Sequence, residues 1–293
     1  MRFAIYSRLI KDKDIPAAQE LFDVISALGI ETAVYQQYIE QLKGKVELPS
    51  NITTFSSHEE LKKVGADVMI TMGGDGTILD TPLLIREMDI PVAGVNLGRL
   101  GFLSNIEKEK ITSVVEEISK GAFKVEERSL LQVESNIPIF KGQNFALNDC
   151  TFLKRDTSSM IIVHTYINGE YLNSYWADGV IIATPTGSTG YSLSCGGPII
   201  LPNSNNFIIT AVAPHNLTVR PIVISDDSVI SFQIEGRAEN FLCTLDSRFE
   251  TITSKHRIAV RKADFKFKLI KLGNDNFLST IRNKLSWGSD VRN

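Results

Sequence analysis

Cysteine is scarce in this sequence, and neither a positive net charge nor a long apolar run is present. The three cysteines, Cys150, Cys195 and Cys243, lie far apart, without the paired spacing of a zinc site or a disulfide framework. The net charge is −3 and the Lys and Arg residues are spread along the chain, so the basic footprint of a nucleic-acid-binding protein is missing. No apolar run approaches the roughly 20 residues that a membrane span needs. We therefore expect buried thiols and a protein that binds neither nucleic acid nor membranes.

The rest of the composition is that of a globular protein, with 43% hydrophobic and 22% charged residues. A length of 293 residues exceeds a comfortable single core and suggests two domains. The N-terminal stretch MRFAIYSRLIKDKD has only short apolar pieces, interrupted by Arg8 and Lys11, so it lacks the apolar core of a secretory signal. We expect a cytoplasmic location.

The hydrophobic pattern changes character once along the chain. In residues 1–124, short apolar runs alternate with helical stretches, which is typical of an α/β domain with a mainly parallel sheet. The strand-like runs are Phe3–Tyr6, Thr32–Tyr35, Val68–Met72 and Val92–Val95, and the helical stretches are Ile15–Leu28, Leu83–Met88 and Lys108–Lys120, the last ended by Gly121.

Residues 125–272 show short strand-like runs separated by turn signals, which predicts a mostly β second domain. Asn168-Gly169 stands between two alternating runs and suits a type I′ hairpin turn. Later runs are Phe207–Val212, Pro221–Ile224, Val229–Ile234, Phe241–Leu245, Arg257–Val260 and Phe265–Leu272. Within residues 273–293, an amphipathic helix at Phe277–Leu285 is expected to pack back onto the first domain.

A glycine-rich loop, Gly73-Gly74-Asp75-Gly76, directly follows the apolar run that ends at Met72. Ligands bind outside the carboxyl ends of parallel strands, and glycines let a phosphate approach the backbone. The loop lacks the lysine of a P-loop and the spacing of a Rossmann fingerprint. Asp75 there could accept a hydroxyl proton or hold magnesium, the two tasks of carboxylates in phosphoryl transfer. The alternative is a tight turn whose Asp caps the next helix.

The helix after this loop has two possible starts. One is Thr77, whose spacing to Asp80 fits a capping box, and the other is Thr81 ahead of Pro82. Either start would direct free N–H groups and a positive dipole end toward the loop, which suits an anion.

Two further stretches carry polar side chains. Between Thr184 and Gly197 nearly every residue except Tyr191 is small, hydroxylated or glycine, so the stretch could line a pocket around a sugar or a base, or be a glycine-rich turn region. Asn148 and Asp149 could reach one ligand from a strand end or bulge, or form an Asx turn.

The order GGDGT, then LND, then DG followed by TPTGSTGYSLSCGGPI resembles the NAD kinase family, as does GVNLGRLGFLSNI at residues 94–106. The resemblance covers about residues 66–222 most closely. It implies transfer of the terminal phosphate of ATP, or of inorganic polyphosphate, to the 2′-hydroxyl of the adenosine ribose of NAD, giving NADP. It also implies Mg²⁺ carried mainly by the nucleotide and a homodimer or homotetramer.

The resemblance also assigns roles to particular residues. Asp75 would be the proton acceptor, with Gly73, Gly74, Gly76 and Thr77 beside it at the nucleotide, and no protein metal ligand is implied. Asn148, Asp149 and Asp178 would contact the dinucleotide. The adenosine segment comprises Thr189, Gly190, Tyr191, Ser192, Leu193 and Ser194, with Thr186 as a further binding residue, while Ser159, Trp176 and Arg248 fall at variable ligand-facing positions. Gly190 and Cys195 stand where the family usually has alanine.

Two other functions share part of this pattern. Lipid kinases of the diacylglycerol and sphingosine type have a GGDGT loop before a β-rich domain, but lack the TPTGSTGYSLSCGGPI segment. A non-catalytic dinucleotide sensor on the same fold would bind NAD without turnover. The four histidines are scattered. His215 stands where members of the family often have a histidine near the dinucleotide.

Overall fold

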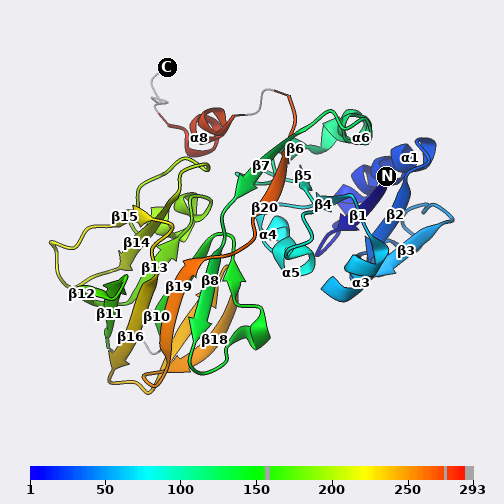
Figure 1. Ribbon diagram of the computed structural model, residues 1–293. Coiled ribbons are helices and arrows are strands. Elements are labelled where there is room, and N and C mark those ends of the chain that lie inside the picture. Colours follow the sequence, from blue (N-terminus) through cyan, green and yellow to red (C-terminus); the bar gives the residue numbers. More distant parts are fainter. Residues whose placement is uncertain (156–158, 274–275, 288–293) are drawn as a thin grey trace. The chain divides into compact units, whose positions relative to one another are not determined.

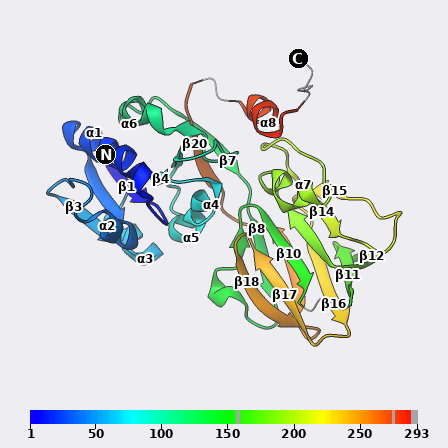
Figure 2. The ribbon, with the colours of Figure 1, turned by 180° about the vertical axis from the view of Figure 1, so that it is seen from behind.

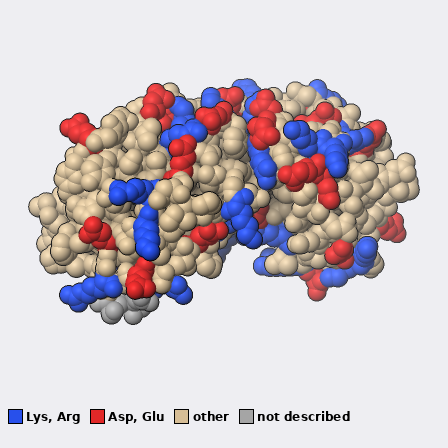
Figure 3. Space-filling view, turned by 60° about the horizontal axis from the view of Figure 1, so that its bottom comes forward, with Lys and Arg blue, Asp and Glu red and all other residues tan. Residues whose placement is uncertain are grey.

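The computed structural model describes residues 1–155, 159–273 and 276–287. The chain divides into two compact units, each of which can be followed in Figures 1 and 2. Unit 1 comprises Met1–Glu127 with Phe267–Asn293, and unit 2 comprises Arg128–Lys266. Charges of both signs are interspersed over the face shown in Figure 3. No helix within the described ranges is long and apolar enough to span a bilayer.

Unit 1 is built on one sheet with the order β3-β2-β1-β4-β5-β20-β7, and β6 pairs with β5. The pairings of β1 with β2 and β4, of β2 with β3, and of β5 with β4, β6 and β20 are parallel. The strands are β1 (Arg2–Tyr6), β2 (Glu31–Tyr35), β3 (Ile52–Phe55), β4 (Val68–Met72), β5 (Val92–Asn96), β6 (Ile106–Glu107), β7 (Lys124–Arg128) and β20 (Phe267–Lys271). The predicted parallel α/β layer is confirmed.

Helices α1 (Ile15–Ala27) and α6 (Ile111–Ser119) pack on this sheet because each carries an apolar stripe at helical spacing. The predicted helix Lys108–Lys120 is a short 3₁₀ turn, Lys108–Lys110, followed by α6. Gly121 follows it with φ +69°, as a C-terminal glycine should. The other helices are α2 (Gln36–Leu42), α3 (His58–Val64), α4 (Asp75–Ile78), α5 (Thr81–Ile85) and α8 (Phe277–Leu285), with a 3₁₀ turn at Asp12–Asp14.

Strand β20 corrects one sequence-based assignment. We expected the run Phe265–Leu272 in the β-rich domain, yet β20 pairs with β5 of unit 1, where Leu269 faces Val92. A short apolar strand looks the same in the sequence whichever sheet it joins, so its partner follows from the path of the chain.

Unit 2 consists of two antiparallel sheets, ordered β15-β14-β13-β10-β17-β18 and β12-β11-β16-β19-β8-β9. The strands are β8 (Leu131–Ser135), β9 (Phe145–Ala146), β10 (Asp149–Lys154), β11 (Ile161–Ile167), β12 (Glu170–Ala177), β13 (Gly179–Ala183), β14 (Asn206–Val212), β15 (Ile222–Ser225), β16 (Ile230–Gly236), β17 (Asn240–Leu245), β18 (Arg248–Thr253) and β19 (Arg257–Lys262). Helix α7 (Tyr191–Ser194) and 3₁₀ turns at Phe140–Gly142 and Gly187–Thr189 complete the unit. The predicted mostly β domain is confirmed.

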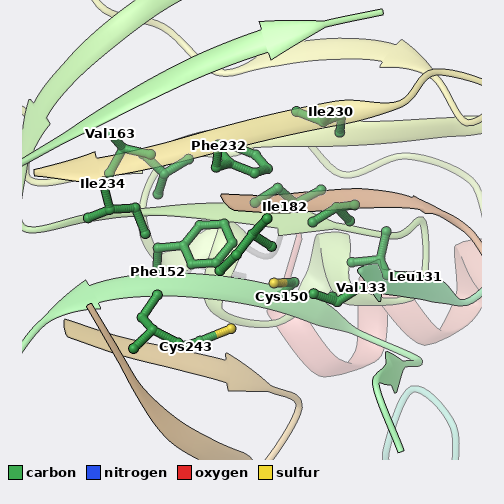
Figure 4. Close-up of a cluster of buried hydrophobic side chains, with 14 of the residues drawn as sticks. Leu131, Val133, Cys150, Phe152, Val163, Ile182, Ile230, Phe232, Ile234 and Cys243 are labelled. Carbon is green, nitrogen blue, oxygen red and sulfur yellow. The ribbon is translucent and has the colours of Figure 1, made fainter. Parts of the chain in front are cut away.

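Side chains from both sheets form the core of unit 2. Phe152 of β10 meets Phe232 of β16 with ring centroids 4.8 Å apart, and the thiols of Cys150 and Cys243 are buried among them (Figure 4). Asn168 and Gly169 have φ of 51° and 85° between β11 and β12, as the type I′ turn requires.

Candidate functional site

The strand order of unit 1 places two loops together at a topological switch point. Strand β1 lies between β2 and β4, so the connections on its two sides run in opposite directions, and ligands of such sheets bind beyond the carboxyl ends there. Ser7 and Arg8 follow β1, and the loop Gly73–Gly76 follows β4. The Ser7 hydroxyl donates to the carbonyl oxygen of Met72 at 2.6 Å, which joins the two strand ends.

The Asp75 carboxylate is held by the backbone of the loop after β5. Its Oδ2 accepts a hydrogen bond from the N–H of Phe102 (2.8 Å), and its Oδ1 accepts from those of Leu103 (3.0 Å) and Ser104 (2.9 Å). The Ser104 hydroxyl donates to the Gly73 carbonyl oxygen at 2.8 Å. Three backbone donors fix the orientation of the carboxylate. The side chain still keeps 29% of its surface exposed.

The loop glycines fall into two groups. A Cβ on Gly73 would lie 2.2 Å from Oγ1 of the buried Thr77, so packing within the protein requires glycine there. A Cβ on Gly74 would meet nothing within 4 Å, and one on Gly76 would meet only Arg8 Nη1, at 3.8 Å. The backbone at Gly74 and Gly76, beside Asp75, is therefore open, and the packing of the protein does not require glycine at either position.

The helix start after this loop differs from one of the two alternatives. Helix α4 begins at Asp75 with Gly74 as N-cap, so the capping box at Thr77 is wrong, whereas α5 begins at Thr81 with Pro82 in its first turn. Helix α4 is a single turn, so the expected dipole at its N-terminus is small. The backbone and the side chains of the loop, rather than a long helix, set its chemistry.

Arg8 is a residue at this switch point that the sequence did not single out. Its guanidinium forms a bidentate ion pair with Asp80, which also accepts a hydrogen bond from the Tyr6 hydroxyl at 2.9 Å. Burial raises the pKa of Tyr6, and the charge of Asp80 adds to this effect. The Arg8 side chain remains 44% exposed and faces Gly76, so a cation stands beside the glycine loop.

Lys284 of α8 also approaches Asp75. Its Nζ lies 3.8 Å from Asp75 Oδ2, donates to the carbonyl oxygen of Leu100 at 3.0 Å, and stands 5.2 Å from the centroid of the Phe102 ring. Phe102 also packs against Phe277, so it is a packing residue. A cavity of about 620 Å³ lies alongside, lined by residues of the loop after β5, of the 3₁₀ turn Lys108–Lys110 and of α8, among them Arg99, Asn105, Lys110, Ser279 and Asn283.

In unit 2, Asn148 and Asp149 lie at the start of β10, the strand end from which both could reach one ligand. Thr184 holds this segment from one side, because its N–H donates to the Asn148 carbonyl oxygen (2.9 Å) and its hydroxyl to that of Leu147 (2.6 Å). A Cβ on Gly187 would lie 2.1 Å from the Asn148 carbonyl oxygen. The glycine-rich segment and the Asn-Asp pair are therefore packed together.

The Asp149 carboxyl is buried and accepts a hydrogen bond from the Thr151 hydroxyl at 3.0 Å. Burial, with the nearby charge of Asp246 adding to it, raises the pKa of Asp149 to about 7, while the Thr151 hydrogen bond acts in the opposite direction. A carboxyl that titrates near neutrality is often a functional group.

The adenosine segment predicted from the resemblance is mostly packed within the protein. Thr186 is buried, the Thr189 hydroxyl donates to the Thr186 carbonyl oxygen, and the buried Ser192 shares a hydrogen bond of 2.9 Å with Thr210. A Cβ on Gly190 would lie 3.3 Å from the Gly187 carbonyl oxygen and 3.9 Å from Asn148 Nδ2. Leu193 is half-buried and Ser194 is exposed.

Tyr191 is the exposed aromatic side chain of this region, at 41%. Burial raises the pKa of Tyr191, and the charges of Cys195, Asp178 and Asp149 add to the effect. Asp178 pairs with Lys154 at 2.6 Å. The structure thus keeps Asn148 and Asp149 together at the start of β10, whereas Asp178 lies beside Lys154 at the other end of that strand.

The remaining predicted positions lie in different surroundings. Trp176, 54% exposed, and His215 line a separate cavity of about 360 Å³. Arg248 donates to the carbonyl oxygens of Gln143 and Phe145 and supports the segment before β10. Ser159 is half-buried in the connection between β10 and β11.

The comparisons with known proteins agree with this architecture. The ATP-NAD kinase N-terminal domain matches residues 3–123, and the ATP-NAD kinase C-terminal domain matches residues 147–272. The NAD kinase of Cytophaga hutchinsonii is 47% identical over 294 residues, which cover 100% of both chains. Those of Flavobacterium psychrophilum and Bacteroides fragilis are 41% and 42% identical, again over the full length of both chains.

Two solved structures share the fold. The yeast NADH kinase, solved with NADH, superposes with a TM-score of 0.89 at 23% identity, covering 99% of this chain and 89% of its own. The NAD kinase of Archaeoglobus fulgidus, solved with ATP, gives 0.75 at 23% identity, with 98% and 99% covered. The α/β unit and the two-sheet unit therefore define a kinase of the two-domain NAD kinase architecture. The chain belongs to the ATP-NAD kinase family.

Proposed function

We propose that this protein transfers the γ-phosphate of ATP to the 2′-hydroxyl of the adenosine ribose of NAD, in a Mg²⁺-dependent reaction that gives NADP and ADP. Full-length relatives at 40–47% identity are NAD kinases, which supports the reaction. The observation that carries the chemical assignment is the environment of the Asp75 carboxylate. Three backbone N–H groups hold it, and the two glycines that flank Asp75 have open backbone.

Asp75 accepts the proton of the attacking hydroxyl. A carboxylate offers about four lone-pair positions, and three are used by the N–H donors of residues 102–104, which leaves one for the proton. As the bond between the 2′-oxygen and the γ-phosphorus forms, the bond from that phosphorus to the β-phosphate oxygen breaks, and ADP leaves. A general base contributes about 10² to 10⁴ in rate to such a step.

The phosphates of ATP approach the open backbone at Gly74 and Gly76, with Arg8 beside them. The described residues contain no cluster of three or more His, Cys, Asp or Glu side chains that could hold a metal ion. Magnesium commonly keeps water and phosphate oxygens as ligands, so an ion carried by ATP fits a loop with the single carboxylate of Asp75. Bound Mg²⁺ would neutralise phosphate charge during transfer.

The dinucleotide is bound by residues of unit 2. Asn148 and Asp149 contact its hydroxyl-rich part, Asp178 adds a further acceptor from the other end of β10, and Tyr191 offers an exposed aromatic face. Residues 189–194 form the adenosine segment, in which Gly190 and Ser192 act through packing, and Thr186 is a further binding residue. Trp176, Ser159 and Arg248 are variable ligand-facing positions of the family, and Arg248 acts through the segment before β10.

The protein acts in the cytoplasm as a homodimer or homotetramer, in keeping with the family resemblance. Sedimentation equilibrium of the purified chain tests the assembly, and a monomeric mass at micromolar concentration would contradict it.

The experiment for the reaction measures NADP formed from NAD, ATP and Mg²⁺, read through an NADP-specific dehydrogenase. Wild type is expected to form NADP, and Asp75→Asn is expected to lose at least about 10²-fold in kcat. The matched control is Asp89→Asn, which alters a carboxylate of the same unit that is 75% exposed and paired with Lys268.

Thermal unfolding and NAD binding are measured beside turnover, because Asp75 also anchors the loop after β5. A folded Asp75→Asn protein that binds NAD and turns over like wild type would refute the base assignment. Wild type that forms NADP from polyphosphate but not from ATP would change the donor and keep the acceptor.

A further inference from the structure

The turn between β17 and β18 is fastened to the start of β10. Asp246 is the first residue of this two-residue turn, and its carboxylate accepts hydrogen bonds from three successive N–H groups, those of Leu147 (2.9 Å), Asn148 (2.7 Å) and Asp149 (3.2 Å). Its own N–H donates to the Asp149 carbonyl oxygen at 3.1 Å. Asp246 was not singled out from the sequence, because almost 100 residues separate it from the Asn-Asp pair.

Asp246 has the left-handed backbone conformation, with φ 53°. That conformation is uncommon outside glycine, although Asp and Asn adopt it more readily than most residues. The turn thus carries a carboxylate at a position where glycine would form the hairpin more easily. The function of that carboxylate lies in its contacts with residues 147–149.

The opposite side of the same segment is held by the glycine-rich stretch, through Thr184 and Gly187. The carbonyl oxygens of Leu147 and Asn148 accept from Thr184, and the N–H groups of residues 147–149 donate to Asp246. The backbone of the Asn-Asp pair is therefore fixed on both sides, and its side chains are placed by that backbone.

We infer that Asp246 is a positioning residue for dinucleotide binding, which acts by holding the backbone of Asn148 and Asp149 in the orientation that presents their side chains to the dinucleotide. This inference rests on the proposed function, which assigns dinucleotide contacts to Asn148 and Asp149. A substitution outside a site that misplaces the groups of the site can strongly lower the rate of the reaction.

The charge of Asp246 supplies a second, independent consequence. It adds to the effect of burial in raising the pKa of Asp149 to about 7. The titratable groups around Asp149 are Asp246 on the turn, Cys150 on β10 and Tyr191 on α7, and Arg248 acts on Asp246 in turn. Removing the Asp246 charge therefore lowers the pKa of Asp149, as would any change that exposes the Asp149 carboxyl, because burial is the larger cause.

Asp246→Asn is the first variant. Asn tolerates the left-handed backbone and keeps the side-chain shape, while it loses the charge and one acceptor oxygen. The Kd for NAD, measured by calorimetry, and the KM for NAD are expected to rise at least about tenfold, since hydrogen bonds to a charged group are among the stronger ones. The KM for ATP is expected to stay within about threefold of wild type.

Asp246→Gly is the second variant, because glycine keeps the turn and deletes the carboxylate, and so covers the case in which the Asn variant fails to fold. Asp227→Asn is the control, since Asp227 also lies in a turn of unit 2, is 81% exposed, and pairs with Lys262. The control is expected to bind NAD like wild type. Thermal unfolding confirms that each variant is folded.

The pH profile of kcat/KM for NAD tests the effect of the Asp246 charge, while the comparison of NAD with ATP separates positioning from general damage. Wild type is expected to change slope near pH 7, and Asp246→Asn at a lower pH, toward the ordinary range of an aspartate. A folded Asp246→Asn protein with unchanged Kd for NAD, or with equal losses for NAD and ATP and an unmoved inflection, would overturn the inference.

The outcome for the reaction itself is read separately. Wild type that binds NAD but forms no NADP would contradict the proposed function, and the calorimetric comparison of wild type with Asp246→Asn would still decide the role of Asp246. Wild type without any NAD binding would overturn both.

Discussion

The Asp75 side chain occupies the space that a Cβ atom at residue 101 would need: its Oδ1 lies 1.7 Å from the ideal Cβ position of Gly101. The loop after β5 can close over the carboxylate only because residue 101 is glycine, and the N–H groups of residues 102–104 then reach both carboxylate oxygens. The position of the proposed base thus depends on a residue that carries no side chain.

Gly101→Ala is expected to displace the Asp75 carboxylate and to lower kcat by about 10²-fold, the loss associated with a misplacement of about 1 Å. Gly98→Ala is the matched control in the same loop, because its Cβ would meet only Asn96 Oδ1, at 3.9 Å. Steady-state kinetics of both variants, with thermal unfolding as a check, provide the measurement. Equal turnover of the two alanine variants would show that the Asp75 position does not limit the reaction.

Arg8→Gln is expected to raise the KM for ATP by about tenfold, because it removes a cation that faces the open loop at Gly76. The KM for NAD should change much less. Arg2→Gln serves as the control, since Arg2 lies at the opposite end of β1 and pairs with Glu31. A larger effect on NAD than on ATP would place Arg8 on the acceptor side of the reaction.

Asp149→Asn is expected to stabilise the fold above neutral pH. The folded-state pKa of Asp149, about 7, exceeds its ordinary value of 3.8, so its contribution to stability is complete below about pH 3.8 and is lost as the pH rises through 7. Each pKa unit corresponds to about 1.4 kcal/mol, so the gain at pH 8 should reach a few kcal/mol at most and disappear near pH 4.

Urea unfolding of wild type and Asp149→Asn across this pH range gives the comparison. A difference that is the same at every pH would mean that Asp149 does not titrate near neutrality in the folded protein. If the gain is found together with weaker NAD binding, the buried carboxyl is retained for its function despite its cost in stability.

Features that depend on neighbouring residues could be predicted from the sequence. The glycine loop after β4, the I′ turn at Asn168-Gly169 and the helical stripe of α6 were all predictable, because each is written in neighbouring residues. The helix start at Thr77 failed since the loop glycines let the chain turn into α4 two residues earlier.

Contacts between distant segments were not predictable from one sequence. Arg8 reaches Asp80 from the end of another strand, and Asp246 reaches residues 147–149 from the end of β17, the neighbour of β10 in the sheet. No periodicity or motif marks such pairs, because their partners follow from strand order. The same reason left β20 in the wrong domain.

The position of β20 has a consequence for how the chain acquires its structure. In the described part of the chain, β7 joins the sheet of unit 1 through β20, a strand that is made after the whole of unit 2. During synthesis from the N-terminus, the edge of β5 that β20 will cover waits unpaired while about 170 residues emerge from the ribosome, at roughly 5–20 residues per second. The synthesis of unit 1 begins first and ends last. A ribosome that stalls before it has made β20 therefore leaves this edge of the sheet exposed.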